Sequence, residues 1–407
     1  MNYIKRDIES TILATSRSYA SLILTGPRQV GKSTTLQHLA EKERTEVTLD
    51  DEEARRLAKT DPELFLSLYK APLLIDEVQY APELFSRIKI EIDRGAAPGS
   101  YWMTGSQPFH LMKLAQESLA GRAAILTMPS LSQGEIYGEE TKSPFSLELS
   151  MLQERAKSRK SIDTLQQYER IWQGSLPGHV SGKYPQRDVF YSSYLQTYIQ
   201  RDIRELYEGV DYLQFADFIR AAACRAGNLL NVHSIAQDVG VSDDTAKRWL
   251  GLLEKSGIIF YLRPYSNNLL KRTIKTPKMY FFDTGLIAYL TKYSSPEILM
   301  NGAINGAIFE NYVVSEILKS YSNQGLEAIY HHYRDKDSRE IDFVLESDGE
   351  LHPIEVKKTA SPPTELAGKF KVLDKASVPR GTGAIVCTKR ELSAIDKTTI
   401  IVPAWTI

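Results

Sequence analysis

The stretch GPRQVGKST, residues 26–34, follows the apolar run SLILT, residues 21–25, and decides how the first part of the chain folds. Gly26 and Gly31 permit backbone angles that other residues resist, so N–H groups of the loop can point inward and form a nest for an anion. The apolar run predicts a buried strand, and TTLQHLA, residues 34–40, predicts a helix whose positive N-terminal end adds to the nest. Strand, loop and helix together indicate a binding site for the phosphates of a nucleotide.

The loop also carries the side chains that phosphate binding needs. Lys32 is expected to reach the β- and γ-phosphates of ATP, and Ser33 is expected to bind Mg²⁺ through its hydroxyl group. The predicted nucleotide-binding residues are Gly26, Pro27, Arg28, Gln29, Val30, Gly31, Lys32, Ser33 and Thr34.

A second stretch, APLLIDEVQ at residues 71–79, supports this site. Residues 73–75 are typical of a central strand in a parallel sheet, where apolar side chains follow one another without alternation. Asp76, at the end of this strand, is expected to hold Mg²⁺ directly or through water. Glu77 is the candidate for orienting or deprotonating the attacking water.

A third strand is predicted in SYWMTGSQ, residues 100–107, which ends in polar side chains. Either Ser106 or Gln107 is placed to sense the γ-phosphate. The predicted strands lie near residues 22–25, 46–49, 73–76, 101–104 and 124–128. Residues 1–140 therefore predict an α/β domain with a parallel sheet and helices on both faces.

Composition sets further bounds. The chain has 407 residues and a net charge of −1, so two or three domains are expected and bulk charge does not attract the protein to nucleic acid. Cys224 and Cys387 form neither a disulfide framework nor a zinc site by their spacing. The first ten residues lack the apolar segment of a signal peptide, and no run reaches the ~18 apolar residues of a membrane span. We expect a cytoplasmic protein without a membrane partner.

The next part of the chain is predicted to be mostly helical. Residues 138–160 are polar and charged and are interpreted as a lid or linker. Residues 189–207 predict an amphipathic helix whose aromatic side chains belong to the core rather than to a binding surface. We assign this lid and helical region to residues 141–227.

Residues 228–262 indicate a helix-turn-helix with a wing. A short helix precedes Gly240, which makes the turn, and Ser242 caps the next helix. The β-like run at residues 258–262 predicts the wing, and the whole winged region is assigned to residues 228–299.

DNA contact is expected from the second helix of this pair and from a basic cluster that follows it and also contains Lys278. Asp243 and Asp244 at the start of the helix oppose the approach of phosphate, so the alternative is a winged helix used only for packing or protein contact. The predicted DNA-binding residues are Ser242, Thr245, Lys247, Arg248, Lys271, Arg272 and Lys275.

Residues 300–407 predict a second α/β unit. Its expected elements are a helix at 306–321, a turn at 347–349, and strands at 340–345, 353–357, 384–387 and 399–402. In EIDFVL, residues 340–345, period-two alternation puts Ile341, Phe343 and Leu345 on one face and the acids Glu340 and Asp342 on the other.

A hairpin of these strands can bring Asp342, Glu355 and Lys357 together, and Glu310 in the preceding helix is placed to join them. Metal-assisted hydrolysis of a phosphodiester needs such groups, because carboxylates bind Mg²⁺ or Mn²⁺ and the metal activates water. The alternative is a half-exposed hairpin with charged residues on its wet face.

Taken together, these features resemble a prokaryotic family that pairs an N-terminal AAA-type ATPase domain, AAA_14, with a C-terminal domain, DUF4143. The resemblance covers nearly the whole chain. The matching segments are LTGPRQVGKST, LLIDEVQ, MTGSQPFHLM, ESLAGR followed by LSQGEI, YIQRDI, NVHSIAQDVGVSDDTAKRWL, KRTIKTPKMYFFDTGL, FENYVVSEILK, EIDFVLE and IEVKK.

The resemblance implies that the tail has a PD-(D/E)xK nuclease-like fold, with Glu310, Asp342, Glu355 and Lys357 at the matching positions and a second Mg²⁺ or Mn²⁺ as a cofactor. It also implies that Arg122 senses the γ-phosphate, either within its own chain or from a neighbouring subunit. Because ATPases of this class generally work as rings, a homo-oligomer such as a hexamer is implied as well.

Three functions follow as hypotheses. The first is an ATPase that acts on DNA by remodelling, translocation or branch migration. The second is an ATP-gated, metal-dependent DNA nuclease in DNA processing or defence. The third is a nucleotide-controlled switch that binds protein partners and has an inert tail.

Overall fold

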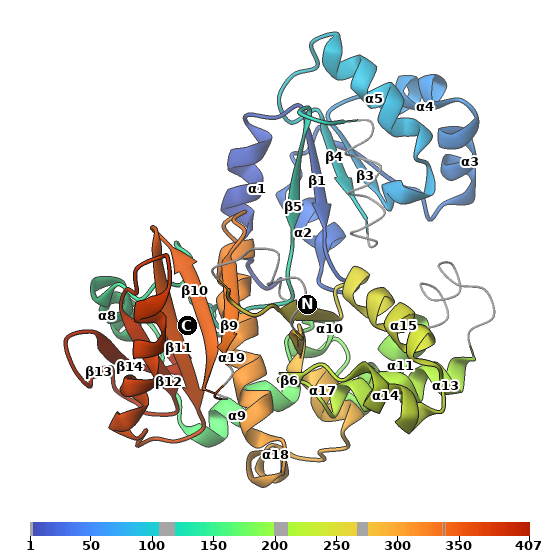
Figure 1. The fold of residues 1–407 in the computed structure, drawn as a ribbon. Helices are drawn as coiled ribbons and strands as arrows, with labels where there is room; N and C mark the ends of the chain where they lie inside the picture. The colour runs from blue at the N-terminus through green and yellow to red at the C-terminus, as the bar shows by residue number, and fades with distance from the viewer. Residues whose placement is uncertain (1–2, 106–118, 199–210, 267–275, 336, 338) are drawn as a thin grey trace.

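The computed structural model describes residues 3–105, 119–198, 211–266, 276–335, 337 and 339–407 (Figure 1). Five residues singled out in the sequence lie outside this part of the chain: Ser106, Gln107, Lys271, Arg272 and Lys275.

The first part of the chain alternates strands and helices. Its elements are α1 (Glu9–Ser16), β1 (Ser21–Thr25), α2 (Lys32–Leu39), β2 (Thr45–Thr48), α3 (Glu52–Thr60), α4 (Pro62–Leu68), β3 (Leu73–Asp76), η1 (Val78–Tyr80), α5 (Glu83–Asp93), β4 (Tyr101–Thr104) and β5 (Ala123–Thr127). All five strands are parallel and lie in the order β2-β3-β4-β1-β5. The predicted parallel sheet is confirmed.

The strand order decides where the polar residues meet. Strand β1 lies between β4 and β5, and β4 pairs with β3 on its other side. Because parallel strands all end at the same edge, the segments after Thr25, Asp76 and Thr104 meet there. Leu22 and Ile23 of β1 point into different hydrophobic clusters, so this strand is buried on both faces.

The middle part is mostly helical. Its elements are α7 (Gln133–Tyr137), α8 (Leu149–Ser158), α9 (Thr164–Gln173), α10 (Pro177–Val180), α11 (Arg187–Tyr198), α13 (Tyr212–Ala223), β6 (Asn228–Leu229), α14 (Val232–Val239), α15 (Asp243–Lys255), β7 (Ile259–Leu262), β8 (Lys278–Phe281), α17 (Thr284–Leu290) and α18 (Pro296–Asn301). The aromatic side chains of α11 are buried, as expected.

The helix pair α14–α15 lies where the sequence predicts it. Gly240 ends α14 with a left-handed backbone (φ 72°), and the Ser242 hydroxyl accepts a hydrogen bond from the Thr245 N–H at the start of α15. Strand β7 follows and pairs antiparallel with β8, which also pairs with β6. Three helices, α13 to α15, thus accompany a small antiparallel sheet of order β6-β8-β7.

The C-terminal part forms a second sheet. Its elements are α19 (Asn305–Ser322), β9 (Ile329–Arg334), β10 (Glu340–Ser347), β11 (Glu350–Lys357), η3 (Thr364–Lys375), β12 (Gly383–Cys387), β13 (Ser393–Ala394), β14 (Thr399–Pro403) and η4 (Ala404–Thr406). The sheet is mixed, with the order β13-β14-β12-β11-β10-β9. Asp348 and Gly349 both have positive φ and make the two-residue turn of the β10–β11 hairpin. The α/β fold class is confirmed in both sheets.

One face assignment in β10 differs from the expected alternation. The pairing of β10 with β9 shifts register between Ile341 and Val344, as in a β-bulge. Ile341 therefore shares a hydrophobic cluster with Val344, whereas Phe343 packs in the main core. Asp342 lies within the shifted segment, so strict period-two counting misplaces its neighbours.

The stretch expected to be a lid or linker, residues 138–160, is in part packed core. Phe145 and Leu152 are fully buried, and the second of these belongs to helix α8. The Phe145 N–H donates to the hydroxyl of Ser320 in α19 at 2.8 Å. A few apolar residues in this polar stretch thus pack into the core. The sequence could not show this, because a partner such as Ser320 lies in a distant part of the chain.

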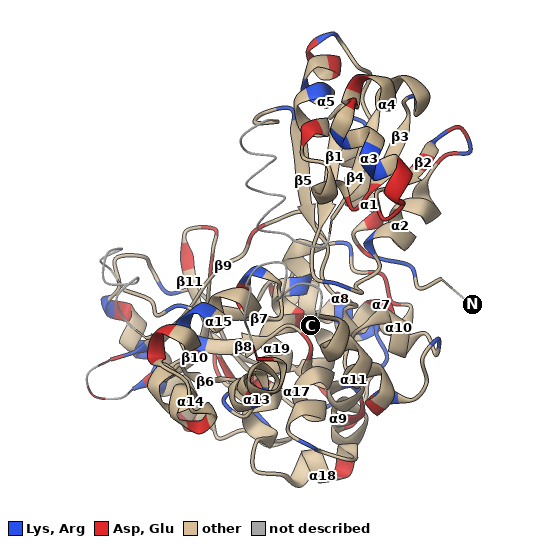
Figure 2. Ribbon diagram, turned by 90° about the vertical axis from the view of Figure 1, so that its right-hand side faces the viewer, with Lys and Arg blue, Asp and Glu red and all other residues tan. Residues whose placement is uncertain are grey.

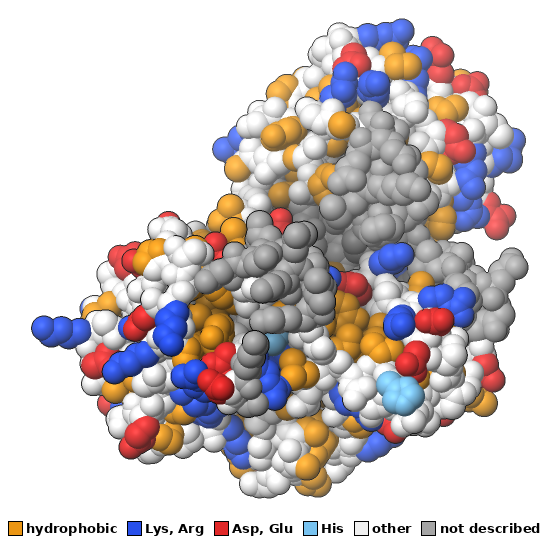
Figure 3. All heavy atoms as spheres, viewed as in Figure 1, with side chains coloured by type: hydrophobic (Ala, Val, Ile, Leu, Met, Phe, Trp, Pro, Cys, Tyr) orange, Lys and Arg blue, Asp and Glu red, His pale blue; other side chains and the backbone are white. Residues whose placement is uncertain are grey.

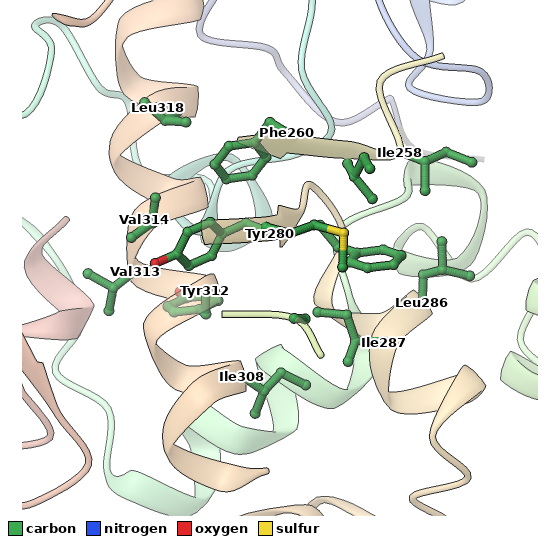
Figure 4. Packing of buried hydrophobic residues seen from close by; sticks show 14 of the residues in the cluster. Ile258, Phe260, Tyr280, Leu286, Ile287, Ile308, Tyr312, Val313, Val314 and Leu318 are labelled. Atoms are coloured by element: carbon green, nitrogen blue, oxygen red, sulfur yellow. The ribbon is translucent and has the colours of Figure 1, made fainter. Parts of the chain in front are cut away.

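A single hydrophobic cluster joins all parts of the chain. It contains Leu24 of β1, Tyr191 of α11 and Phe309 of α19, and it continues into the C-terminal sheet through Phe343. Figure 4 shows Tyr280 of β8 reaching toward α19, close to Phe260 and Tyr312. The core thus continues across the predicted domain boundaries. Within the described ranges, no helix has both the length and the apolar character to cross a bilayer.

Packing of α8 gives a prediction for stability. Leu152→Ala removes a side chain with 0% exposure, so we expect a loss of about 2–5 kcal/mol in the free energy of unfolding. Leu149→Ala in the same helix is the matched control, because Leu149 is 50% exposed and its loss should cost about 0.5 kcal/mol or less. Urea unfolding followed by circular dichroism measures both, and equal effects would mean that α8 is not part of the core.

Candidate functional site

The loop after β1 has the backbone conformation that an anion nest requires. Gly26, Gln29 and Gly31 have φ values of 140°, 59° and 96°. A Cβ atom on Gly26 would collide with the carbonyl oxygen of Met128, so both the backbone angle and the space demand glycine there. Gly31 forms the N-cap of α2, whose N-terminal end faces the loop.

Lys32 lies within this loop rather than on the surface. Its Nζ atom donates to the carbonyl oxygens of Gly26 at 2.9 Å and Pro27 at 2.8 Å. The residue is buried, with 7% exposure. The ammonium group therefore sits over the nest, at the position from which it would contact the phosphates of a nucleotide.

Side chains that fit a magnesium ion meet at the edge of the sheet. Ser33 donates its hydroxyl hydrogen to Asp76 Oδ1 at 2.6 Å, and Thr104 at the end of β4 donates to the same oxygen. Hydroxyl and carboxylate oxygens are the hard ligands that Mg²⁺ prefers, so Ser33 and Asp76 fit the predicted ion. When bound there, such an ion would offset the negative charge of the phosphate groups. Thr104 was missed in the sequence, although it belongs to the strand whose polar end drew attention.

Glu77 lies beside this pair in a special conformation. Its φ of 56° is in the left-handed region, which is uncommon for a non-glycine residue. Gln79 donates its side-chain amide hydrogen to Glu77 Oε2, and the Glu77 N–H donates to the Thr104 hydroxyl at 3.4 Å. The strained turn and both hydrogen bonds fix this carboxylate near Asp76, as its proposed role with water requires.

A buried ion pair supports the loop from behind. Arg6 contacts Glu135 at 3.0 Å and donates to the carbonyl oxygens of Val30 and Pro129, each at 2.8 Å. Glu135 also accepts from the N–H groups of Asp7 and Ser132 at 2.7 and 2.8 Å. Sequence reasoning gave Arg6 no role, because its partners lie far along the chain; Glu135 belongs to LSQGEI, a segment quoted only for its resemblance.

A cavity of about 460 Å³ opens beside the loop. Its walls come from the N-terminal arm, the loop, the start of α2 and the segment around α10. The lining residues include Tyr3, Ile4, Gln29, Gly31, Thr34 and Pro177. This volume lies in the range of small-molecule sites, so the cavity has room for the nucleoside part of a nucleotide.

Arg122 lies at the opposite edge of the same sheet. It forms an exposed ion pair with Asp93 at 2.6 Å, and it precedes β5, whose first residue pairs with Ser21 of β1. At about 3.3 Å per residue, roughly 13 Å of strand separates this edge from the end at Thr25. Arg122 therefore lies far from the phosphate loop of its own chain in this structure. Its role at the γ-phosphate, within its own chain or from a neighbouring subunit, stays a prediction.

The end of helix α15 touches the nucleotide loop. A Cβ atom on Gly257, just past this helix, would come within 2.8 Å of the Pro27 side chain. The hydroxyl groups of Tyr198 and Ser256 share a hydrogen bond of 2.7 Å at the same place. In Figure 1, α15 points toward the lower end of the parallel sheet. The helix-turn-helix region thus packs directly against the predicted ATP site.

The other end of α15 faces away and carries mixed charge (Figure 2). Lys247 pairs with Asp244 at 3.4 Å, both exposed, and Arg248 donates to the Thr245 hydroxyl at 3.3 Å. The Ser242 side chain is exposed and also forms the helix cap. These four predicted contact residues lie in the first half of the helix. The acidic side chain of Asp244 lies among them and offsets part of their positive charge.

The C-terminal residues predicted as a nuclease-like site do come together. Lys357 Nζ lies 3.3 Å from Asp342 Oδ2 and 2.9 Å from Glu355 Oε1. Lys369 of η3 lies 2.8 Å from the same Glu355 oxygen. Glu310 of α19 lies across from Asp342, and both contact one further lysine.

That further lysine is Lys278, which corrects an expectation. The sequence placed it in the basic cluster that faces DNA, but its side chain is only 5% exposed. Its Nζ atom lies 3.0 Å from Glu310, 2.6 Å from Glu340 and 3.6 Å from Asp342. A buried ammonium group needs such partners, and these acids provide them.

Burial and the neighbouring charges shift the pKa values of Glu310 and Lys278. Burial raises the pKa of Glu310 to about 7, aided by the nearby Asp342 and opposed by Lys278. Burial alone would lower the pKa of Lys278, but Glu310, Asp342 and Glu340 outweigh it and hold this pKa above its usual range. In the part of the chain that the structure describes, no group of three His, Cys, Asp or Glu residues is arranged to hold a metal ion.

Comparison with protein families agrees with this organisation. Residues 18–137 match an AAA domain (AAA_14), and residues 305–407 match a domain of unknown function (DUF4143). Residues 164–297, which include the helix-turn-helix pair, match another domain of unknown function (DUF8612). The resemblance to AAA_14 and DUF4143 is confirmed.

Two mycobacterial proteins are similar over the whole chain. The uncharacterized protein Rv2008c of Mycobacterium tuberculosis and the uncharacterized protein Mb2031c of Mycobacterium bovis are each 27% identical over 405 residues, or 98% of this chain and 83% of theirs. Among solved structures, the Walker-type ATPase paby2304 of Pyrococcus abyssi covers 71% of this chain and 96% of its own, at 14% identity and a TM-score of 0.42.

The role of Glu77 gives a test of the site. Glu77→Gln keeps the size and hydrogen bonding of the side chain but removes the base, so ATP should still bind while turnover falls about 10²–10⁴-fold. Binding of a fluorescent ATP analogue and release of phosphate measure the two effects. Glu83→Gln, an exposed acid on α5, should change neither. Normal turnover in Glu77→Gln would remove this residue as the group that acts on water.

Arg122 is tested by mixing two variants. Lys32→Ala should lose ATP binding and Arg122→Ala should lose turnover, but a mixed oligomer can place the arginine of the first variant at the intact loop of the second. We therefore expect each variant alone to be inactive and the mixture to regain part of the phosphate release. Arg94→Ala, which removes another exposed arginine, one that pairs with Glu91, is the control. Full turnover in Arg122→Ala alone would show that the residue is not needed.

Proposed function

We propose that the chain is an ATPase that uses nucleotide binding and hydrolysis to act on DNA, since residues 18–137 match the AAA domain model (AAA_14) and residues 305–407 match DUF4143. The ATPase part rests on the family and on the loop, the Ser33–Asp76 pair and Glu77. The action on DNA is the part that needs a test. Remodelling, translocation and branch migration are the forms that this action would take.

The contact between Gly257 and Pro27 carries the proposal. A loop that closes on phosphate changes shape, and the atoms packed against it must follow, because protein interiors are close-packed. Pro27 belongs to this loop, and Gly257 directly follows α15. Nucleotide state would therefore move α15, which is the helix that a winged helix inserts into the major groove of DNA.

Other features of the same region support DNA as the partner. The end of α15 that carries Ser242, Lys247 and Arg248 faces away from the loop and is open to a partner. Lys271 and Lys275 follow the predicted wing at residues 258–262 in the sequence. Phosphate contacts from these two sources would position the helix on the duplex.

A protein-binding switch is the second candidate, and the charge around α15 favours it. Asp243 and Asp244 lie in the first turn, where they stabilise the helix but repel phosphate. Lys278, expected to add to the basic surface, is buried. Among the described residues, the face drawn in Figure 3 mixes basic and acidic side chains. Such a surface also suits a protein partner, so the first experiment must separate the two functions.

The test measures binding of labelled duplex and four-way-junction DNA over a series of salt concentrations, together with DNA-stimulated ATP hydrolysis. We expect binding that weakens with salt, and turnover that rises with DNA. Replacing Lys271 and Lys275 by alanine should lower the slope of log Kd against log salt by about 1.8, since each phosphate contact contributes about 0.9. Lys247→Ala with Arg248→Ala should also weaken binding. Lys59→Ala, an exposed lysine on α3, should not.

The outcome decides between the two candidates. Absence of DNA binding and of stimulation, in a protein that still hydrolyses ATP, would contradict the action on DNA and favour the protein switch. Unchanged salt slopes in the variants would place the DNA surface elsewhere on the molecule.

A further inference from the structure

The C-terminal carboxylate cluster has an unusual internal partner. Its acids, Glu310, Glu340 and Asp342, come from α19 and β10, whereas Lys278 comes from β8 of the small antiparallel sheet. The Nζ atom lies within 3.6 Å of an oxygen of each acid. Three carboxylates around one cationic group are the surroundings that a protein gives to a metal ion, but here the cation is covalently part of the chain.

Lys278 is held in this place by the strand that carries it. It pairs with Leu262 of β7 and Leu229 of β6, so its backbone lies in the centre of that sheet. Next along β8, Tyr280 donates its hydroxyl hydrogen to Glu310 Oε1 at 2.6 Å. The ammonium group therefore cannot move far without disturbing a buried region.

Strand β8 is also hydrogen-bonded to α19 through Phe281, which follows Tyr280, and Asn311, which follows Glu310. The Asn311 side chain accepts from the Phe281 N–H at 2.8 Å and donates to the Phe281 carbonyl oxygen at 2.7 Å. At the other side, the Tyr265 N–H donates to the His332 carbonyl oxygen at 2.6 Å, and the His332 N–H donates to the Arg263 carbonyl oxygen at 3.0 Å. The β7–β8 pair and the C-terminal sheet thus form one hydrogen-bonded unit.

Charge counting shows what a metal would meet. The four acids of the cluster are Glu310, Glu340, Asp342 and Glu355, and the three lysines that contact them are Lys278, Lys357 and Lys369. Arg334 also lies 3.8 Å from Glu340, so four positive groups face the four acids and leave no net negative charge to attract a divalent ion. The lysines contact one oxygen each of Glu310, Glu340 and Glu355 and both oxygens of Asp342. The buried Oε2 atom of Glu355 has no hydrogen-bond partner among the described residues.

We propose that Lys278 is the built-in cation of this cluster: it occupies the place of a divalent metal, so that the residues resembling a nuclease site serve instead as an ionic joint between the helix-turn-helix region and the C-terminal domain. A second Mg²⁺ or Mn²⁺ does not fit the residues as they are arranged. The tail then holds the small antiparallel sheet in place and does not cut DNA. This inference does not depend on ATP hydrolysis or on the proposed action on DNA.

The experiment measures Mn²⁺ binding without nucleotide, by electron paramagnetic resonance of the free ion, in full-length protein that carries Lys32→Ala. Asp76 and Glu77 remain near the altered loop and can bind some Mn²⁺ themselves. Each result is therefore compared with that of the same protein carrying Glu355→Gln, which changes only the C-terminal cluster. We expect the two proteins to bind Mn²⁺ equally. Binding that Glu355→Gln abolishes would overturn the proposal, because the cluster would then accept a metal with Lys278 in place.

A second pair of variants tests the lysine itself. Lys278→Met removes the charge and keeps much of the side-chain volume, so the variant should bind one additional Mn²⁺ per chain. The affinity of the cluster for Mn²⁺ should rise at least tenfold over that of the parent protein. Lys278→Arg keeps the charge and should bind no additional ion. Adding Asp342→Asn to Lys278→Met should abolish the gain. A folded Lys278→Met protein with no gain would overturn the proposal, and if that variant does not fold, the comparison with Glu355→Gln decides alone.

Discussion

The ion pair between Arg6 and Glu135 is the constraint on which the nucleotide site depends. Both side chains are almost fully buried, and the guanidinium group reaches the carbonyl oxygen of Val30 inside the loop. Glu135 Oε1 also accepts a hydrogen bond of 3.5 Å from the side-chain amide of Asn323, which directly follows α19. Breaking a buried pair leaves an uncompensated charge, which costs about 3–5 kcal/mol. The N-terminal arm, the loop and α7 are therefore held together by this ion pair, and Asn323 adds one hydrogen bond from the end of α19.

The two acidic centres of the molecule differ in what neutralises them. At the end of β3, Asp76 accepts from the hydroxyl groups of Ser33 and Thr104, which are neutral, so its negative charge stays available to a cation. In the C-terminal sheet, Asp342 and Glu355 face ammonium groups. The same residue types thus serve opposite purposes.

The local parts of this fold could be predicted, and the distant contacts could not. The phosphate loop follows from two glycines and a strand, and α15 follows from the Ser242 cap and apolar spacing, because these features act over a few residues. The burial of Lys278 could not be foreseen, since its partner Glu310 lies 32 positions further along the chain. The same holds for Leu152 in the stretch taken for a linker. The face of Ile341 was misjudged because a bulge breaks the alternation, and no residue type announces a bulge there.

Helix α19 explains how movement at the nucleotide loop would reach the other end of the chain. One side of it packs against β7 and β8, with Tyr280 close to Val313 in Figure 4, and its buried Phe309 belongs to the core that includes β1. The loop touches α15 through Pro27. A shift of α15 would move β7 and β8, which follow it in the fold. The ionic joint and the Asn311 hydrogen bonds connect β8 directly to α19, so α19 and the C-terminal sheet would move with it. Nucleotide binding would therefore move the helix-turn-helix region and the C-terminal domain together, against the parallel sheet, and not one against the other.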